Sequence, residues 1–227
     1  MKTTKQILVV SLLAIMGSQV QAVELSNHEQ KFSYIMGVRM SKMLQAQGMD
    51  KLEPAAFAAG VTDAINGQPT RLTQEQMAEV MKAQQAAKRK AREEAGKAAL
   101  AAGQQFMEEN KAKPGVVTLE SGLQYQEITA GAGDSPKETD KVKVHYRGKL
   151  INGKQFDSSY DRGQPATFGV KGVIPGFSEA LMLMKPGSKW KVFIPSDLGY
   201  GARGAGSNIG PNETLVFDLE LLEIVKQ

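Results

Sequence analysis

The stretch KQFDSSY, residues 154–160, places the carboxyl group of Asp157 directly after the aromatic ring of Phe156. The flanking residues are typical of a buried β-hairpin, where an ionised side chain is costly unless it has a partner. The common explanation is a carboxylate that faces solvent. The alternative is that Asp157 polarises a molecule held against the neighbouring rings, and the rest of the sequence must distinguish the two.

Other kinds of reaction centre are poorly supported. The chain has no cysteine, and its two histidines, His28 and His145, lie in different regions. A nucleophile–base pair or a His/Cys metal site is therefore not predicted, and no metal or other cofactor is expected. His145 falls on the polar side of an alternating strand and is interpreted as a structural or surface histidine. The glycine-rich stretch 199–210 lacks the ending of a phosphate-binding loop and is interpreted as a surface loop.

The C-terminal half of the chain, from about residue 113, has the pattern of β-strands. In KVKVHY, residues 141–146, apolar and polar residues alternate strictly, which predicts a strand buried on one face. Its apolar side is Val142, Val144 and Tyr146. A hairpin turn is predicted at Asn152-Gly153. Further strands are expected over residues 190–194 and 214–224.

One short helix is expected in the same region. Phe177, Leu181 and Met184 recur at helical spacing, and Pro186-Gly187 closes the segment. A twisted antiparallel β-sheet wrapped around this short helix is the simplest arrangement. It places the domain in the α+β class.

The region before residue 73 is predicted to be all helical. A first helix follows Ser26, and a second is expected from about Pro54 to Ile65. These two helices bury too little surface to form a stable unit alone. Methionine, which suits adaptable interfaces, is concentrated in and near them: Met36, Met40, Met43, Met49, Met77 and Met81. Packing within the chain is the simpler interpretation, but we favour a homodimer interface because a small helical unit needs a partner.

A long connecting helix is predicted over residues 73–112. A capping box at Thr73 and Gln76 begins it. Residues 82–99 include no large apolar side chain, so we expect an exposed strut stabilised by helix propensity and surface charge pairs. Disorder is the alternative. Two glycines could allow this helix to bend: Gly96 and Gly103.

The N-terminus has the features of a secretory signal peptide. Lys2 and Lys5 precede an apolar stretch of about ten residues, and a small-residue cleavage site ends at Ala22. The stretch is too short for a membrane span, and no later segment is apolar enough to be one. We therefore expect a signal peptide at residues 1–22 and export to the periplasm. The formal net charge of +4 is small, so nucleic-acid binding is not predicted.

Three stretches resemble the FKBP-type peptidyl-prolyl cis-trans isomerases. They are VHYRGKLINGKQFDSSYDRGQPATF, VIPGFSEALMLMKPGSKWKVFIPSDLGYG and NETLVFDLELLEI, and they follow the family's order from about Leu119 to the C-terminus. The whole chain is similar to the periplasmic subfamily of the macrophage infectivity potentiator (Mip). That resemblance implies V-shaped homodimers joined through N-terminal helices, often with chaperone activity. It also implies four parts: signal peptide 1–22, helical dimerisation domain 23–72, connecting helix 73–112 and isomerase domain 113–227.

The resemblance implies a pocket that binds proline. Its expected catalytic residues are Asp157, Tyr200 and Phe156. The expected substrate-binding residues are Tyr146, Val173, Ile174, Phe177, Ile209 and Phe217, with the backbone N–H of Ile174 as a hydrogen-bond donor. Phe177 stands where many members have tryptophan, and Ala166 where many have a pocket-lining phenylalanine. Both replacements are expected to leave the pocket slightly roomier.

The implied activity is rotation of Xaa-Pro bonds in exported proteins. The implied partners are proline-containing unfolded or folding polypeptides, and macrolide-type inhibitors of the family are further candidate ligands. One alternative is a non-catalytic periplasmic holdase that uses the pocket only as a binding surface, and another is a small-molecule receptor. A fragment from about Lys113 onward is expected to keep activity on a short peptide and to lose avidity for unfolded proteins. Location at the outer surface or secretion is the alternative to the periplasm.

Overall fold

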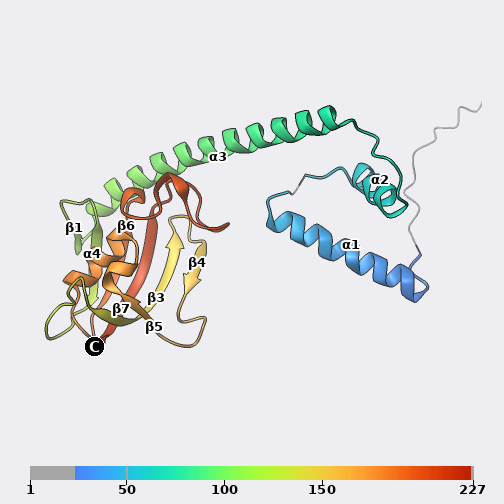
Figure 1. The fold of residues 1–227 in the computed structure, drawn as a ribbon. Helices are drawn as coiled ribbons and strands as arrows, with labels where there is room; N and C mark the ends of the chain where they lie inside the picture. Colours follow the sequence, from blue (N-terminus) through green and yellow to red (C-terminus); the bar gives the residue numbers. More distant parts are fainter. Residues whose placement is uncertain (1–23, 50, 226–227) are drawn as a thin grey trace, which may run out of the picture. The chain divides into compact units, whose positions relative to one another are not determined.

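The computed structural model describes residues 24–49 and 51–225 (Figure 1). They divide into two compact units, with the boundary between Gln68 and Pro69. The predicted signal peptide, residues 1–22, lies outside the described residues. No helix within the described ranges is long and apolar enough to cross a membrane.

The described residues of the first unit form two helices, α1 (His28–Ala46) and α2 (Pro54–Ile65). Asn27 caps α1 through a capping box with Gln30. At the start of α2, the carboxylate of Glu53 accepts hydrogen bonds from the first backbone N–H groups, and proline occupies the first helical position. The predicted bounds of α2 are confirmed. As described, neither helix contains a buried residue.

The second unit begins with α3 (Gln74–Lys111), one continuous helix. Its capping box at Thr73 and Gln76 is confirmed. The expectation of a strut exposed along its whole length is wrong, because three residues of its C-terminal half are buried against the sheet domain: Gly96, Gly103 and Asn110. They are spaced by seven, which is close to two helical turns, and therefore share one face. The high helix propensity of its residues explains why α3 forms. The face that carries these three residues is the one that packs against the sheet domain.

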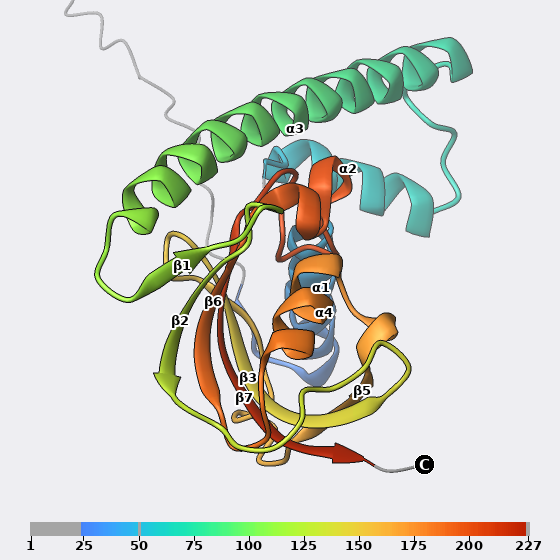
Figure 2. The same cartoon turned by 90° about the vertical axis from the view of Figure 1, so that its left-hand side faces the viewer.

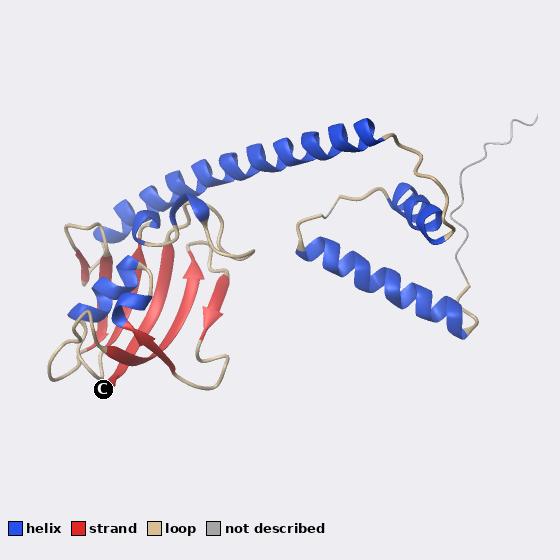
Figure 3. Ribbon diagram, in the orientation of Figure 1, coloured by secondary structure: helices blue, strands red, loops and turns tan. Residues whose placement is uncertain are grey.

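The sheet has seven strands, all paired antiparallel (Figure 3). They are β1 (Val116–Thr118), β2 (Gln124–Thr129), β3 (Lys141–Leu150), β4 (Gln155–Ser158), β5 (Ala166–Gly169), β6 (Lys189–Ile194) and β7 (Leu215–Val225). The order is β1-β2-β6-β7-β3-β4, and β5 also pairs with β3. Strand β3 is therefore central, with β7 along one side and both β4 and β5 along the other.

The core lies between this sheet and helix α4 (Pro175–Leu183), which lies across one face of it (Figure 2). Three 3-10 turns complete the fold: η1 (Val170–Gly172), η2 (Ser196–Leu198) and η3 (Gly201–Arg203). The predicted inward faces of β3 and β7 are buried: Val142, Val144, Tyr146, Leu215, Phe217, Leu219 and Leu221. The predicted α+β class is confirmed.

The predicted hairpin at Asn152-Gly153 is confirmed. Gly153 has a φ of 85°, a left-handed conformation that glycine adopts readily. The side-chain oxygen of Asn152 accepts a hydrogen bond of 2.9 Å from the N–H of Lys154. This turn returns the chain so that Asp157 of β4 lies opposite Gly148 of β3.

Candidate functional site

A pocket of about 380 Å³ lies between α4 and the sheet. It is lined by Tyr146, Phe156, Asp157, Phe168, Gly172, Val173, Ile174, Phe177, Tyr200 and Phe217. Eight of the nine predicted site residues are therefore brought together. The exception is Ile209, which is buried in the hydrophobic core and does not line the pocket.

Aromatic rings form the walls and floor of the pocket. The ring of Phe177 lies edge-on to that of Phe217, with centroids 5.1 Å apart, and the ring of Phe156 lies edge-on to Phe217 at 5.6 Å. Edge-to-face contacts are the favoured geometry for aromatic pairs. The rings hold one another in place, so the pocket is largely formed before any ligand arrives.

Gly148 makes this ring arrangement feasible and was not predicted as a site residue. A Cβ at Gly148 would lie 2.5 Å from the ring of Phe156 and 2.7 Å from that of Phe217. Any side chain here would push the two rings apart. The sequence signal was a glycine inside an alternating strand, which often marks close approach of another group.

Phe168 also lines the pocket and was not predicted. Phe168 lies two residues after Ala166 in β5, and residues two apart in a strand lie on the same side of it. Its ring is 5.7 Å from that of Tyr146 and 6.3 Å from that of Phe177. The wall that Ala166 was expected to leave open therefore still contains an aromatic side chain.

The polar part of the pocket is a hydrogen-bonded group of Asp157, Tyr146 and Arg162. The Tyr146 hydroxyl donates to Asp157, and Arg162 donates to the same carboxylate. Arg162 also donates to the Tyr146 hydroxyl oxygen at 2.8 Å, and its guanidinium lies 5.4 Å from the centre of the tyrosine ring. The backbone N–H of Ser158 donates to Asp157 at 2.8 Å. Asp157 is thus fully engaged at the pocket edge.

Arg162 is a functional candidate that the sequence reasoning missed. It follows Asp157 by five residues in the loop after β4, and this spacing has no fixed meaning outside a helix. Only the return of the loop brings its guanidinium over Tyr146. The available signal was a single cation beside an acid that lacked an obvious partner.

These contacts set the charge states of the polar group. Burial acts to raise the pKa of Asp157, but hydrogen bonds from Tyr146 and Arg162, with the charge of Arg162, lower the pKa overall. Burial, followed by the hydrogen bond to Asp157, raises the pKa of Tyr146 despite the opposing effect of Arg162. At neutral pH the site therefore holds a carboxylate, a neutral phenol and a guanidinium.

Two hydrogen-bonding groups at the pocket have no partner among the described residues. Within the part of the chain that the structure describes, no group accepts from the N–H of Ile174 or pairs with the hydroxyl of Tyr200. Ile174 is the residue that precedes the first turn of α4, and Tyr200 is 38% exposed. An unpaired N–H beside an apolar pocket can donate a hydrogen bond to a ligand carbonyl at little cost.

Of the two interpretations of His145, structural or surface, its contacts favour the structural one. Its ring stacks on that of Tyr160 with centroids 4.6 Å apart, and its Nδ1 lies 2.9 Å from the hydroxyl of Ser159. Burial, then the hydrogen bond to Glu220, raises the pKa of Tyr160 to about 12. The Ser159 hydroxyl also accepts from the backbone N–H of Tyr146 at 2.8 Å. This group supports the back of the strand that carries Tyr146.

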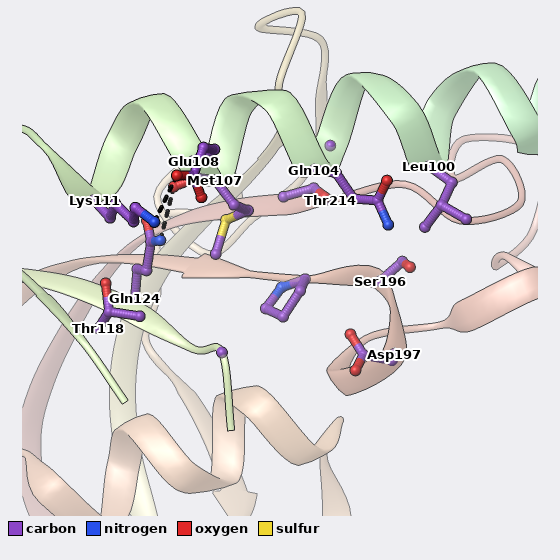
Figure 4. A pocket seen from close by; sticks show the side chains of 13 residues that line it. Leu100, Gln104, Met107, Glu108, Lys111, Thr118, Gln124, Ser196, Asp197 and Thr214 are labelled. Carbon is purple, nitrogen blue, oxygen red and sulfur yellow. Dashed lines mark hydrogen bonds and ion pairs between the residues drawn. The ribbon is translucent and has the colours of Figure 1, made fainter. Parts of the chain in front are cut away.

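A larger groove of about 620 Å³ lies between α3 and the sheet domain (Figure 4). Its lining mixes apolar and polar side chains, including Leu100, Met107, Asp197 and an ion pair of 2.6 Å between Lys111 and Glu108. It has no group of converging rings and no charged network comparable to that around Asp157. The smaller pocket is therefore the candidate site.

Comparison with known families identifies both parts of the chain. A model described as FKBP-type peptidyl-prolyl cis-trans isomerase matches residues 133–222. A second, described as the domain amino terminal to FKBP-type peptidyl-prolyl isomerase, matches residues 29–126. The pocket residues from Tyr146 to Phe217 lie within the first match.

The chain aligns with related proteins over most of its own length and most of theirs. The chain is 46% identical over 209 residues to the outer membrane protein MIP of Legionella longbeachae, covering 90% of this chain and 89% of the relative. It is 45% identical over 201 residues to the FKBP-type 22 kDa peptidyl-prolyl cis-trans isomerase of Escherichia coli K12, covering 87% and 96%.

Solved structures support the same fold. The crystal structure of FkpA from Escherichia coli matches with a TM-score of 0.64 at 36% identity, covering 88% of this chain and 98% of that one. A peptidyl-prolyl cis-trans isomerase from Pseudomonas syringae pv. tomato matches with a TM-score of 0.54 at 45% identity, covering 57% and 96%.

Proposed function

Because the chain belongs to the FKBP-type peptidyl-prolyl cis-trans isomerases, we propose that its aromatic pocket binds the prolyl ring of an Xaa-Pro segment and that the bond rotates there. One observation carries this proposal. Six aromatic rings and an ion-paired carboxylate converge on one pocket of about 380 Å³. That volume and lining suit a small apolar ring with an amide attached.

The reaction breaks no covalent bond. Rotation about an Xaa-Pro amide meets a barrier of about 20 kcal/mol because the twisted amide loses its resonance. In the twisted state the carbonyl carries less negative charge and the nitrogen becomes pyramidal. A pocket of fixed apolar walls favours this less polar species over the planar amide, and only such differential binding accelerates the reaction.

The walls and the unpaired groups take different roles. Phe156, Phe177 and Phe217 enclose the prolyl ring, together with Tyr146. The N–H of Ile174 donates a hydrogen bond to a carbonyl of the substrate backbone, and the hydroxyl of Tyr200 holds a second backbone group. These two anchors hold the peptide on one side of the bond while the other side turns.

Asp157 acts electrostatically and transfers no proton. Its carboxylate is held by Tyr146 and Arg162, so the charge is fixed in position before substrate binds. Charges fixed in advance stabilise a transition state without the cost of reorganising solvent. In this proposal, the carboxylate beside Phe156 orients its neighbours and shapes the field at the substrate carbonyl.

The test is the cis-to-trans rate of a short Xaa-Pro peptide. Asp157→Ala is expected to lower kcat/KM about tenfold, which corresponds to about 1.4 kcal/mol. Asp134→Ala removes an exposed carboxylate elsewhere on the same domain and serves as the matched control. If Asp157→Ala keeps a near-normal kcat/KM, the proposed electrostatic role is wrong.

The chain acts as a homodimer joined through α1 and α2. What supports this is the exposure of their large apolar side chains in the single chain: Phe32, Tyr34, Ile35, Met36, Val38, Met40, Met43, Val61 and Ile65. So many large apolar side chains exposed on two short helices indicate an interaction site. The alternative interpretation, packing within the chain, is not favoured because neither helix as described buries a residue.

The substrates are proline-containing unfolded or folding polypeptides in the periplasm, reached through the signal peptide, and the protein also acts as a chaperone. Two linked pockets would hold such a chain more tightly than one. Macrolide-type inhibitors of the family fit the same apolar pocket. A second candidate, a non-catalytic holdase, is supported by the exposed apolar face of α1, which could itself hold unfolded segments.

A fragment separates these functions. The cut belongs before Pro69, because α3 packs against the sheet domain and a start at Lys113 would remove that contact. The fragment 69–227 is expected to retain the rate on a short peptide and to lose most of its effect on refolding of a proline-limited protein. A holdase would show no rate enhancement on the peptide in either form.

A further inference from the structure

The loop between β6 and β7 carries one proposed anchor of the substrate and lies against α3. Tyr200 lines the pocket from this loop, and Ile209 enters the core from it. The loop returns to the sheet at Thr214, which lies directly beneath α3 (Figure 4). The helix and the pocket therefore contact opposite parts of the same segment.

Two glycines of α3 make the contact close. A Cβ on Gly96 would lie 2.9 Å from the Cβ of Pro211, closer than such atoms approach, and one on Gly103 would overlap the hydroxyl of Thr214. By contrast, Gly37 in α1 and Gly60 in α2 have open space at this position. The glycines of α3 are thus required by the loop they touch.

Hydrogen bonds also hold the loop against α3, one donated by the helix and one donated by the loop. The guanidinium of Arg92, on the adjacent turn of α3, donates to the backbone carbonyl of Arg203. The side chain of Asn212 donates to the carbonyl of Gly96 at 3.1 Å. Asn212 is the one non-glycine residue with a positive φ, 57°, in the described ranges. A residue held in that conformation reflects constraint by its surroundings.

The loop passes this constraint on to the pocket. The N–H of Asn212 donates to the carbonyl of Gly201 at 2.8 Å, and Gly201 follows Tyr200 directly. Ala205 and Ile209 exchange two backbone hydrogen bonds of 2.9 and 3.1 Å across the loop. Two hydrogen bonds therefore connect the helix to the residue next to Tyr200: Asn212 bonds to Gly96 on one side and to Gly201 on the other.

We infer that the face of α3 formed by Arg92, Gly96 and Gly103 positions the loop that presents Tyr200 to the substrate. Arg92 and Gly96 are positioning residues for the isomerase reaction, although neither lines the pocket. This inference rests on the proposed role of Tyr200 as an anchor. It also changes the status of α3, whose C-terminal half belongs to the working part of the isomerase domain.

The first test compares Gly96→Ala with Gly60→Ala in the full mature chain. Alanine raises helix propensity at both positions, so a purely local effect on the helix is shared. Only Gly96→Ala pushes against Pro211. Because Tyr200 anchors the ground state as well as the transition state, KM for a short Xaa-Pro peptide is expected to rise about fivefold with kcat changed less than about twofold.

A second readout does not depend on activity. The backbone amide resonances of residues 200–212 are expected to shift in Gly96→Ala, while those of residues 156–162 stay in place. Arg92→Ala, at an exposed position, is expected to raise KM in the same direction without affecting folding. Arg92→Lys keeps a donor and is expected to restore part of the loss.

The outcomes are distinguishable. If Tyr200→Phe raises KM but Gly96→Ala and Arg92→Ala match the Gly60→Ala control, the positioning inference is overturned and the proposed site stands. If Tyr200→Phe leaves KM unchanged, the anchor itself is wrong and the inference falls with it. A rise in KM for all three, with loop resonances shifted in the two α3 variants, supports the inference.

Discussion

The two units treat apolar helix faces in opposite ways. In the second unit, the face of α4 is covered by the sheet, and Leu181 is 0% exposed. In the first unit, the face of α1 is uncovered in the single chain, and Ile35 is 52% exposed. Both helices have apolar residues at helical spacing. The spacing of apolar residues therefore predicts that a helix face will be buried. It does not say whether the same chain or a partner chain buries it.

The largest effect is expected where the chain covers its own apolar face. Leu219→Ala removes a fully buried side chain from the sheet, and the free energy of unfolding of the second unit is expected to fall by about 3 kcal/mol. Ile128→Ala, at a residue 56% exposed in β2 of the same unit, is expected to change this free energy by less than about 0.5 kcal/mol. Chemical denaturation followed by the fluorescence of Trp190 measures both. Equal losses would mean that covering an apolar side chain does not set the stability of this unit.

The next effect concerns the uncovered face of α1. The double substitution Ile35→Glu and Met40→Glu puts charges onto that face, and the dissociation constant of the homodimer is expected to rise at least about a hundredfold. Lys90→Glu on exposed α3 is the control for a change of charge. Sedimentation velocity over a concentration series measures the effect. A dimer of unchanged affinity would place the interface away from α1.

A smaller effect is expected at the polar group of the pocket. Arg162→Ala frees the Asp157 carboxylate and the Tyr146 hydroxyl, so kcat/KM on a short Xaa-Pro peptide is expected to fall about fivefold. Arg162→Lys should recover only part, because lysine cannot contact both oxygens in the same fork. Lys154→Ala, an exposed cation of the same hairpin, controls for net charge. Full activity in Arg162→Ala would show that the group does not need its cation.

The smallest effect is expected from pH. The pKa of Asp157 is lowered from its ordinary 3.8 and that of Tyr146 is raised from 10.0, so neither changes charge near neutrality. The stability that the carboxylate contributes is complete above its ordinary pKa and is lost as pH falls through the lowered value. Between about pH 5.5 and 8.5, kcat/KM is expected to vary less than about twofold. A bell-shaped profile in this window would indicate proton transfer.

Local rules account for what the sequence predicted well. The alternation around Val144, the hairpin at Asn152-Gly153 and the capping box at Thr73 each depend on neighbours in the chain, and each is present. The resemblance to a family then brought most of the pocket together from distant segments. Neither source depends on knowing the three-dimensional packing of α3.

The residues that were missed all depend on long-range packing. Gly148 matters because two rings from β4 and β7 meet above it, and Arg162 matters because its loop folds back over Tyr146. At Gly96 and Gly103 the sequence indicates only that the helix could bend, because a helix without large apolar residues gives no sign of a contact face. The loop can approach the backbone of α3 only where the helix has no side chain. A sequence analysis that looks for rows of apolar residues does not detect such a contact.

The seven-residue spacing of Gly96, Gly103 and Asn110 has a consequence for how the chain can vary in length. One inserted residue turns everything beyond it by about 100°, so an insertion between Gly96 and Asn110 would rotate one contact away from the sheet domain. An insertion before Arg92 would leave all three contacts in register. Relatives of this protein should therefore differ in length upstream of Arg92 and keep a constant count of residues from there to the first strand.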